Sequence, residues 1–367
     1  MDILIASSFH PFKGGISKYI TATFREMAKK REIGVICNMP NGSNEEFIDD
    51  EFVFVSRSLF PVTKGGLYRF PFYWNILRLI LVKGWKIDCL YADNIFPTGV
   101  FGLVFKCFFP KKKLVIFTYG SEIIKTKNKW YSKFRQKVLS SADLIATISM
   151  FTANEVGKIS NQKVLLLPPA YEGVFFEKSS NKNAFMLLTV SQLTRRKGHE
   201  YVLRALNELK GKLDFEYVIA GRGPYKSEIE RMIKLLGLEK KVTLMGGVSD
   251  EQLEKLYQEA SVFIMPTFRV ADDIEGFGIV YLEAGAHSLP VIATKSGGAS
   301  DVVCEGENAI VVREKNIEDI KLAILRLYSD KEIGNKLGEG GRKIAVKFSY
   351  EKNAQKILNF ISADKRD

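Results

Sequence analysis

The sequence predicts two doubly wound α/β domains, each built on a parallel β-sheet with helices on both faces, and three observations support this. The chain has 367 residues, more than a single hydrophobic core usually organises. Short apolar runs alternate with segments of helical periodicity, as they do in parallel-sheet proteins. The order strand, loop, helix starts again after the polar stretch at 177–183. Residues 1–176 and 184–348 are therefore expected to form separate domains.

The first half opens with a buried strand. "DILIASS" is a short apolar run that ends in small residues, and the loop "FHPFKGG" and the helical pattern "ISKYITATFREMAKK" follow it. A continuous apolar run of this length is typical of a strand covered on both faces. Further strands are expected at "IGVICN", "DCLYAD", "KLVIFTYG", "LIATIS" and "VLLLPP".

The second half repeats this order. "FMLLTVSQ" (185–192) reads as a buried strand, "LTRRKG" as a loop and "HEYVLRALNELK" as a helix, with later strands at "FEYVIAGRG", "KVTLMG", "SVFIMPT", "PVIAT" and "AIVV". A last helix within 349–367 is expected to pack back on the first domain. In such sheets ligands bind outside the carboxyl ends of the strands, so a cleft between the two domains is the expected site.

The basic charge is concentrated in the first half. The net charge is +12, and residues 1–175 hold 24 Lys and Arg against 14 Asp and Glu, a balance of +10. Such a basic surface suits an anionic membrane or nucleic acid, although a merely soluble basic surface is an equally good interpretation. The sequence contains no RNP-like aromatic motif, zinc-ligand spacing or helix-turn-helix, so nucleic acid is not expected as a partner.

Cysteine and histidine spacing argues against metal sites and disulfides. The four cysteines are far apart with no CxxC, and the three histidines lack the spacing of metal ligands. The N-terminal segment does not resemble a signal peptide, and the longest uncharged runs are too short to span a bilayer. We therefore expect a cytoplasmic protein without a metal or other cofactor, located at most on the inner face of the membrane.

In each half of the chain, a glycine-containing loop follows the first strand. Gly14 and Gly15 in "KGGI" would let the backbone approach a phosphate at a helix start, although an ordinary loop is the alternative. In "QLTRRKG", Lys197 with Arg195 or Arg196 can neutralise a diphosphate, and a solvated basic turn is the alternative. The first strand is not followed by G-x-G-x-x-G, which weighs against a dinucleotide oxidoreductase.

Three further segments carry weaker signals. "AGRGP" places Gly221 and Gly223 at a strand end, where either a plain turn or a ligand-facing turn fits. "TYGSE" places Tyr119 and Glu122 at the carboxyl end of another strand, with a structural tyrosine as the alternative. The aromatic stretch "LYRFPFYWN" followed by "RLILVKGW" is either core or an amphipathic element that docks on a membrane.

The segment "EGFGIVYLEAGAHSLPVI" contains Glu275 and Glu283, eight positions apart rather than the three or four that separate neighbouring acids on one helical face. If a helix starts after Gly276-Phe277-Gly278, Glu275 lies just outside the helix and Glu283 more than a turn inside. A helix start at glycine offers N–H groups to an anion. Two carboxylates there could accept hydrogen bonds from hydroxyl groups, and a phosphate flanked by polyols describes a sugar nucleotide.

These residues together resemble the retaining glycosyltransferases of the GT-B fold, the large family with sucrose synthase-like enzymes and bacterial mannosyl- and glucosyltransferases. The most specific part of the resemblance is the pair Glu275 and Glu283 within "EGFGIVYLEA", followed by "LPVIAT" and "GGASDVV". "VSQLTRRKG" and "VTLMGGVSDEQLEKLYQEASVFIMPT" are also similar to the family. The resemblance covers nearly the whole chain and implies two Rossmann-like domains that face each other across a cleft.

The resemblance also implies roles for individual residues. Glu275 would hold hydroxyls of the donor sugar, Glu283 those of the ribose, and Lys197 would neutralise the diphosphate. The backbone from Gly276 through Phe277, Gly278 and Ile279 would meet the diphosphate, with Gly14 and Gly15 approaching from the first domain. Glu275, Lys197 and Tyr119 are the expected catalytic residues, with no protein nucleophile. The donor is a nucleoside-diphosphate sugar, and no metal is required.

Two positions depart from the family pattern. Gln192 stands where the family has arginine, so Arg195 or Arg196 would supply that charge, and Tyr119 precedes Gly120 where relatives have histidine. The function implied is transfer of a hexose to a lipid-linked or cell-surface glycan precursor, such as a polyprenyl-diphosphate-linked sugar bound by the basic first domain. An epimerase or phosphorylase of similar shape, and a sugar-nucleotide sensor without turnover, are the alternatives.

Overall fold

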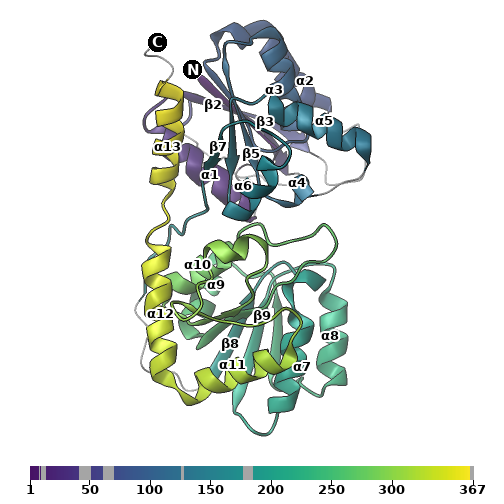
Figure 1. Cartoon of the computed structure of the whole chain (residues 1–367), viewed down its shortest axis with the longest axis vertical. Helices are drawn as coiled ribbons and strands as arrows, with labels where there is room; N and C mark the ends of the chain where they lie inside the picture. The colour runs from purple at the N-terminus through teal and green to yellow at the C-terminus, as the bar shows by residue number, and fades with distance from the viewer. Residues whose placement is uncertain are drawn as a thin grey trace. The chain divides into compact units, whose positions relative to one another are not determined.

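The computed structural model describes residues 1–7, 9, 14–40, 51–60, 70–124, 128–176 and 185–363, and the chain divides into two compact units (Figure 1). Unit 1 comprises Met1–Pro169 with Ser349–Asp367, and unit 2 comprises Ala170–Phe348. The expected linker at 177–183 lies outside the described residues. Each unit contains one parallel sheet with helices on both faces, so the predicted fold class is confirmed.

The first boundary between the units lies before the expected one at residue 176. The segment that begins at Ala170 belongs to unit 2 because its backbone is hydrogen-bonded there. The Phe176 N–H donates to the Ala286 carbonyl over 2.9 Å, and Ser288 Oγ donates to the Phe176 carbonyl over 2.9 Å. These contacts connect residues that are far apart in the chain, so local composition did not indicate them.

Seven parallel strands form the sheet of unit 1, in the order β3-β2-β1-β4-β5-β6-β7. The edge strand β3 was not predicted. It pairs with β2 in a register that puts Gly34 beside Phe54, and a Cβ at Gly34 would lie 2.4 Å from the Phe54 ring. The strands are β1 (Asp2–Ala6), β2 (Ile33–Pro40), β3 (Phe54–Phe60), β4 (Cys89–Ala92), β5 (Lys113–Thr118), β6 (Leu144–Thr147) and β7 (Val164–Leu166).

The helices of unit 1 cover both faces of its sheet. Figure 1 shows α2, α3 and α5 on one side of the strands and α1 with α13 on the other, and α13 packs against α1. Buried side chains of α2, α3 and α5 form one core with the strands. The helices are α1 (Gly15–Ala28), α2 (Phe70–Lys83), η2 (Gly84–Lys86), α3 (Thr98–Phe108), α4 (Ser121–Ile124), α5 (Lys129–Ser140), α6 (Met150–Gly157) and α13 (Tyr350–Ala363).

Six parallel strands form the sheet of unit 2, in the order β10-β9-β8-β11-β12-β13. They are β8 (Phe185–Val190), β9 (Phe215–Ala220), β10 (Val242–Gly246), β11 (Val262–Met265), β12 (Val291–Ala293) and β13 (Ala309–Val311). The central strands are almost wholly apolar because helices bury them on both sides.

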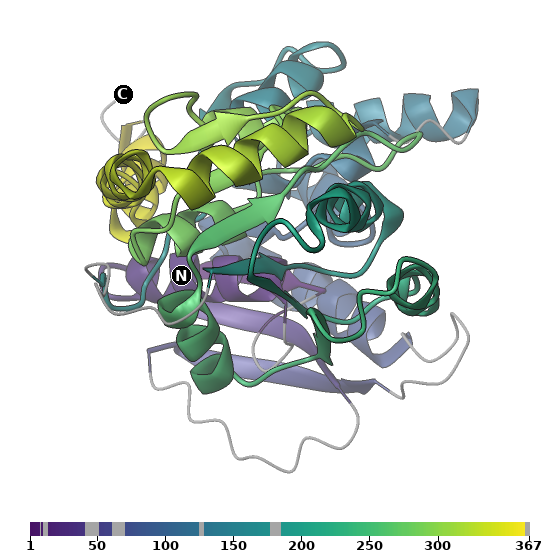
Figure 2. The same ribbon diagram turned by 90° about the horizontal axis from the view of Figure 1, so that it is seen from below.

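The helices of unit 2 also form two layers, as the view from below shows (Figure 2). Side chains of α7, α8 and α11 share one core with the sheet, and α9 and α10 pack on the opposite face. The helices are η3 (Arg195–Lys197), α7 (His199–Leu209), α8 (Lys226–Leu235), α9 (Asp250–Glu259), α10 (Ile279–Ala286), η4 (Gly297–Asp301), α11 (Ile317–Ser329) and α12 (Lys331–Ala345).

Two groups of helices differ in how they begin. A side chain caps α5, α6, α9, α11 and α12, supplied by Asn128, Ser149, Ser249, Asn316 and Asp330 respectively. In contrast, α1, α7 and α10 begin at glycine without a side-chain cap. Their first N–H groups are the natural place for an anion to bind.

No helix within the described ranges is both long enough and apolar enough to cross a bilayer.

Candidate active site

The site in unit 2 forms where the strand order reverses, at the carboxyl ends of β8 and its neighbour β11. The loop after β8 carries η3 and leads into α7, and the loop after β11 leads into α10. Such a switch point is where parallel α/β sheets bind ligands, because the two loops diverge there. The sequence singled out both loops.

Gly198 and Gly278 start α7 and α10 in the left-handed region, with φ of 79° and 86°. Gly198 also needs its missing side chain for space, because a Cβ there would lie 2.2 Å from the Pro266 carbonyl oxygen. The glycine thus lets the two loops lie close together. The expected helix after Gly276-Phe277-Gly278 is confirmed, with Glu275 before its start and Glu283 in its second turn.

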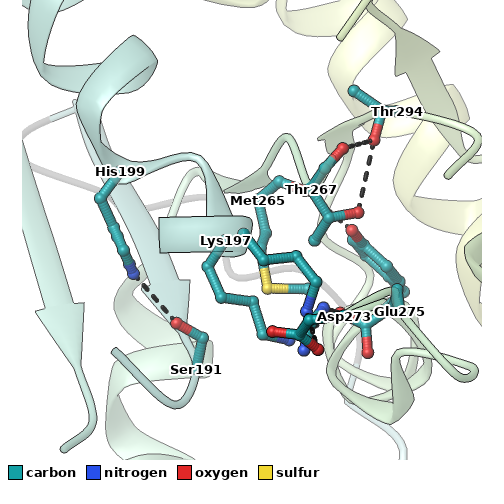
Figure 3. Close-up of polar contacts among 10 residues, drawn as sticks. Ser191, Lys197, His199, Met265, Thr267, Asp273, Glu275 and Thr294 are labelled. Carbon is teal, nitrogen blue, oxygen red and sulfur yellow. Dashed lines mark hydrogen bonds and ion pairs between the residues drawn. The ribbon is translucent and has the colours of Figure 1, made fainter. Parts of the chain in front are cut away.

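A buried cluster of charges lies beside these helix starts (Figure 3). Lys197 Nζ donates to Glu275 Oε2 over 2.6 Å, and Arg196 Nη1 donates to the same oxygen over 2.8 Å. Arg196 Nε donates to Asp273 Oδ1 over 3.0 Å. Two cations from the β8 loop therefore meet one buried carboxylate from the β11 loop, which brings together residues that the sequence placed separately.

The electrostatics of this cluster keep Glu275 ionised. Burial alone would favour the neutral acid, but the charges and hydrogen bonds of Lys197 and Arg196 outweigh it and hold the pKa of Glu275 at about 2. Burial lowers the pKa of Lys197, and the attraction of Glu275 opposes that shift. Burial also opposes the charge on Arg196, yet Glu275 and Asp273 together raise its pKa.

Backbone contacts fix the loop that carries Glu275. The Gly298 N–H donates to the Glu275 carbonyl over 2.8 Å, and a Cβ at Gly297 would lie 2.4 Å from that oxygen. Tyr281 Oη donates to the Met265 carbonyl over 2.8 Å. The segment "GGASDVV" noted in the sequence thus packs against the backbone of Glu275.

His199, at the start of α7, is held neutral. Its Nε2 lies 3.1 Å from Ser191 Oγ (Figure 3). Burial and the nearby Lys197 charge lower the pKa of His199 to about 3. A neutral imidazole leaves Lys197 and Arg196 as the cations of the cluster.

Glu283 lies in a second polar group, on α10. Tyr257 Oη, from α9, donates to Glu283 Oε2 over 2.7 Å. His287 Nδ1 lies 2.7 Å from the Glu283 carbonyl and His287 Nε2 lies 2.7 Å from Glu254 Oε1. The imidazole stacks between the rings of Phe176 and Tyr257, with centroids 5.2 and 5.0 Å away. Both ring nitrogens therefore lie within hydrogen-bond distance of oxygens.

The structure distinguishes among the other residues proposed for the donor. Arg195 and Gln192 are exposed, so Arg196 is the one of the two arginines that joins the buried cluster. Gly221 and Gly223 are required by packing, because a Cβ at either position would lie 1.8 or 2.2 Å from a carbonyl oxygen of the β8 loop. The sequence left open a plain turn or a ligand-facing turn, and packing alone is enough to explain both glycines.

In unit 1, Gly14 and Gly15 lie at the start of α1, and Lys13 before them falls outside the described residues. Within the described residues, a Cβ at either glycine would meet no atom within 4 Å. Packing against the described part of unit 1 therefore does not explain these two exposed glycines.

Tyr119 is partly buried at the end of β5. Its ring packs edge-on against Tyr19 at 6.2 Å, and its buried hydroxyl has no hydrogen-bond partner among the residues that the structure describes. Burial, followed by the charge of Asp93, raises the pKa of Tyr119 well above its usual value. The tyrosine is thus neutral, and its N–H donates to the Glu122 carboxylate.

Two polar groups were not identified from the sequence. Asp93 is fully buried at the end of β4 and accepts hydrogen bonds from Ser7 Oγ and Thr98 Oγ1, each over 2.8 Å. The "YADN" sequence directly after an apolar strand could have indicated it. The contacts of His287 with Glu254 and Tyr257 join two helices, and no local spacing signals such a pair.

In the part of the chain that the structure describes, no three His, Cys, Asp or Glu side chains gather closely enough to hold a metal ion.

Two family models match the chain in succession. Residues 13–172 match the model described as Glycosyltransferase Family 4, and residues 172–344 match Glycosyl transferases group 1. A GDP-mannose-dependent α-(1-6)-phosphatidylinositol monomannoside mannosyltransferase from Mycolicibacterium smegmatis is 27% identical over 94% of this chain and 93% of its own. The similarity thus extends across both units.

Solved structures share the fold. A sucrose-phosphate synthase from Thermosynechococcus elongatus aligns with a TM-score of 0.83 at 18% identity, over 98% of both chains. An Anabaena protein crystallised with UDP-glucose aligns with a TM-score of 0.77 at 17% identity, over 98% of this chain and 99% of its own. With the two parallel-sheet units, these likenesses establish the GT-B fold.

Proposed function

The chain belongs to the group 1 glycosyltransferases and is an enzyme of sugar transfer, and we propose that it moves a hexose from a nucleoside-diphosphate sugar to an acceptor hydroxyl, with retention of configuration and without a metal. One observation carries this proposal. Lys197, Arg196 and Glu275 form a buried charge cluster between two glycine helix starts that lack side-chain caps. This arrangement offers cations and N–H groups to a diphosphate and a carboxylate to an adjoining sugar.

In this proposal the cations of the cluster face the diphosphate, and its carboxylate faces the sugar. Lys197 has three N–H donors, so it can keep its contact with Glu275 while it donates to a diphosphate oxygen. Glu275 is ionised and accepts hydroxyl hydrogens of the sugar. At the second turn of α10, the Glu283 carboxylate, oriented by Tyr257, accepts hydrogen bonds from the ribose. The diphosphate then lies at the start of α10.

The reaction needs charge stabilisation more than a nucleophile. The bond between the anomeric carbon and the diphosphate oxygen breaks, and a bond to the acceptor oxygen forms on the same face of the sugar. The acceptor's proton passes to the leaving diphosphate. Because Lys197 and the N–H groups of α7 and α10 are in place before negative charge builds up, they stabilise it without a metal.

The proposed acceptor is a lipid-linked glycan precursor held by unit 1, at the inner face of the membrane. The mycobacterial relative is named for transfer from GDP-mannose to a phosphatidylinositol mannoside, and residues 1–175 carry a balance of +10 here. A basic surface attracts the phosphates of such an acceptor and of the surrounding lipid. GDP-mannose is the first donor to test.

The test is a transfer assay with chelator present. Purified enzyme is incubated with GDP-mannose, UDP-glucose and related donors, together with phosphatidylinositol mannoside or polyprenyl-diphosphate-sugar acceptors, and the anomeric configuration of the product is read by NMR. We expect one donor to give an α-linked product from an α-linked donor in the presence of EDTA. An inverted product, a requirement for divalent metal, or epimerisation of the donor without transfer would contradict the proposal.

A further inference from the structure

The outer surface of the helix layer in unit 1 exposes an unusual set of aromatic side chains. The chain has three tryptophans, and all of them lie on this layer: Trp74 on α2, Trp85 on η2 and Trp130 on α5, with exposed fractions of 53%, 62% and 84%. Tryptophan is on average largely buried in soluble proteins. With the exposed residues Leu81, Val82, Phe108 and Phe134, they form what we call the tryptophan face.

Helix α2 carries apolar side chains on its outer side as well as its inner side, which core packing alone does not require. Its inner side buries Phe72, Ile76 and Ile80 against the sheet. Trp74 and Leu81, seven residues apart, lie about two turns from each other on its outer side. The sequence left open whether this stretch forms core or docks on a membrane, and packing in the core explains only the inner side.

The exposed apolar residues belong to one continuous layer. The Phe109 ring, at the end of α3, packs so closely on Gly84 that a Cβ there would lie 2.3 Å from it. This contact brings the end of α3, with exposed Phe108, to the turn that carries Trp85. Helix α5, with Trp130, packs on the other side of α3 (Figure 1).

The charge of this layer is of one sign. Residues 70–86, 98–113 and 129–140 contain eleven Lys and Arg and no Asp or Glu. Lys86 Nζ lies 4.9 Å from the centre of the Trp85 ring. The exposed basic residues are Arg78, Lys83, Lys86, Lys111, Lys129, Lys133 and Lys137. A surface with this charge favours an anionic partner.

We infer that the tryptophan face docks on an anionic lipid bilayer. Tryptophan prefers the boundary between headgroups and acyl chains, and flanking lysines reach the lipid phosphates. Helix α2, with its fourteen residues, lies in the interface rather than across it. The inference rests on the proposed function, because a lipid-linked acceptor bound by unit 1 would be presented at the same bilayer. It adds the surface through which the enzyme reaches that acceptor.

The test is flotation of the full chain with vesicles, followed by tryptophan fluorescence. Neutral phosphatidylcholine vesicles are compared with vesicles that also contain phosphatidylglycerol. Because all three tryptophans lie on the proposed face, we expect their emission to shift to shorter wavelength when anionic vesicles are added. Floated protein without this shift would mean that another surface binds, and would overturn the inference.

Two variants separate the apolar and the charged contributions. Leu81→Ser with Trp85→Ser removes apolar contacts, and Lys83→Glu with Lys86→Glu reverses charge. Each is expected to weaken vesicle binding by about tenfold or more, since apolar side chains removed from water and lysines near an anionic surface each contribute on the order of a few-fold or more in affinity. The matched control, Lys234→Glu with Leu235→Ser, changes an exposed basic and apolar pair of unit 2 and should bind like the wild type.

The outcomes are independent of turnover. Donor binding, measured by calorimetry, should be equal in all variants, and its failure in the wild type would contradict the proposed function without affecting the vesicle result. Wild-type protein that does not bind anionic vesicles would overturn the inference. Variants of the tryptophan face that bind as well as the control would also overturn it. A concentration-dependent dimer lost in the Leu81→Ser, Trp85→Ser variant would identify the face as a self-association surface instead.

Discussion

At the residue scale, Glu275 is a buried carboxylate that contacts two cations, so removing its charge leaves both of them without their shared anion. Glu275→Gln keeps the shape of the side chain but not the charge. Breaking a buried pair in this way costs about 3 kcal/mol or more in unfolding free energy. Chemical denaturation at neutral pH measures this loss. Asp273→Asn is the control, because Asp273 is half-exposed and should cost about 1 kcal/mol or less.

The same residue predicts a pH dependence of stability. The pKa of Glu275 is about 2 in the folded protein and 4.5 ordinarily. Because the folded-state pKa is the lower one, its stabilising contribution is complete above pH 4.5 and is lost as the pH falls toward 2. That contribution is about 3 kcal/mol. Melting temperatures between these pH values should fall less for Glu275→Gln than for the wild type, and parallel curves would contradict the assignment.

His287 is predicted to orient the donor-binding carboxylate without touching the donor. His287→Phe keeps the ring between Phe176 and Tyr257 but removes hydrogen bonds to the Glu254 carboxylate and the Glu283 carbonyl. We expect the donor KM to rise about tenfold with kcat little changed.

His287→Gln restores one donor and should recover part of the donor affinity. A variant whose melting temperature falls while its donor KM stays the same would show a purely structural histidine.

Among single residues, the sequence indicated those whose type conflicts with their surroundings. Glu275 and Glu283 interrupt an apolar segment, so both stood out. The partners of Glu283 did not, because Tyr257 lies on a different helix and a tyrosine in an amphipathic helix resembles core. Whether Arg195 or Arg196 enters the cluster was left open because adjacent residues point in different directions.

At the element scale, glycines at helix starts have two distinct causes, and substitution should separate them. Gly278 has φ of 86°, and a Cβ there would lie 2.6 Å from the Tyr281 ring. Gly278→Ala should therefore lose about 1–3 kcal/mol of unfolding free energy. Thermal melts of the purified variant measure the loss.

Gly15→Ala is the contrasting variant, since its methyl group would meet no atom of the described part of the chain within 4 Å. Stability should stay the same or rise slightly, because alanine favours a helix over glycine by about 1 kcal/mol. If the backbone at Gly15 approaches the donor phosphates, kcat/KM should nevertheless fall about tenfold. Unchanged kcat/KM would remove Gly15 from the proposed site.

The elements themselves were largely predictable because parallel strands buried on both faces are continuous apolar runs. The edge strand β3 was missed because an edge strand lacks that environment on one side and its sequence is mixed. The expected helix start after Gly278 was found because glycine, which tolerates positive φ, ends the preceding turn.

At the scale of the whole molecule, helix α13 follows unit 2 in the sequence but belongs to unit 1. Tyr350, Ile357 and Ile361 of α13 are buried against unit 1. Deleting 349–367 should therefore speed hydrogen exchange in α1 while β8 and β11 keep their protection. Equal exchange in both units, or loss confined to unit 2, would contradict the division.

The two-domain organisation could be predicted because each unit starts with a strand, a loop and a helix. The boundary was displaced because the segment from Ala170 to Phe176 is held in unit 2 through backbone contacts with residues far along the chain, which local composition does not reveal. Donor identity could not be predicted, since base and sugar preferences depend on the shape of a pocket and not on the spacing of motifs.

The most direct test of the account is calorimetric titration of nucleoside-diphosphate sugars with metal chelated. GDP-mannose and UDP-glucose are titrated into the wild type, Glu283→Gln and the control Glu314→Gln, which neutralises an exposed glutamate. We predict binding of one donor in the micromolar range, weakened about tenfold or more by Glu283→Gln and unchanged in the control. Equal binding by all three proteins, or binding only with divalent metal, would contradict the proposed donor site.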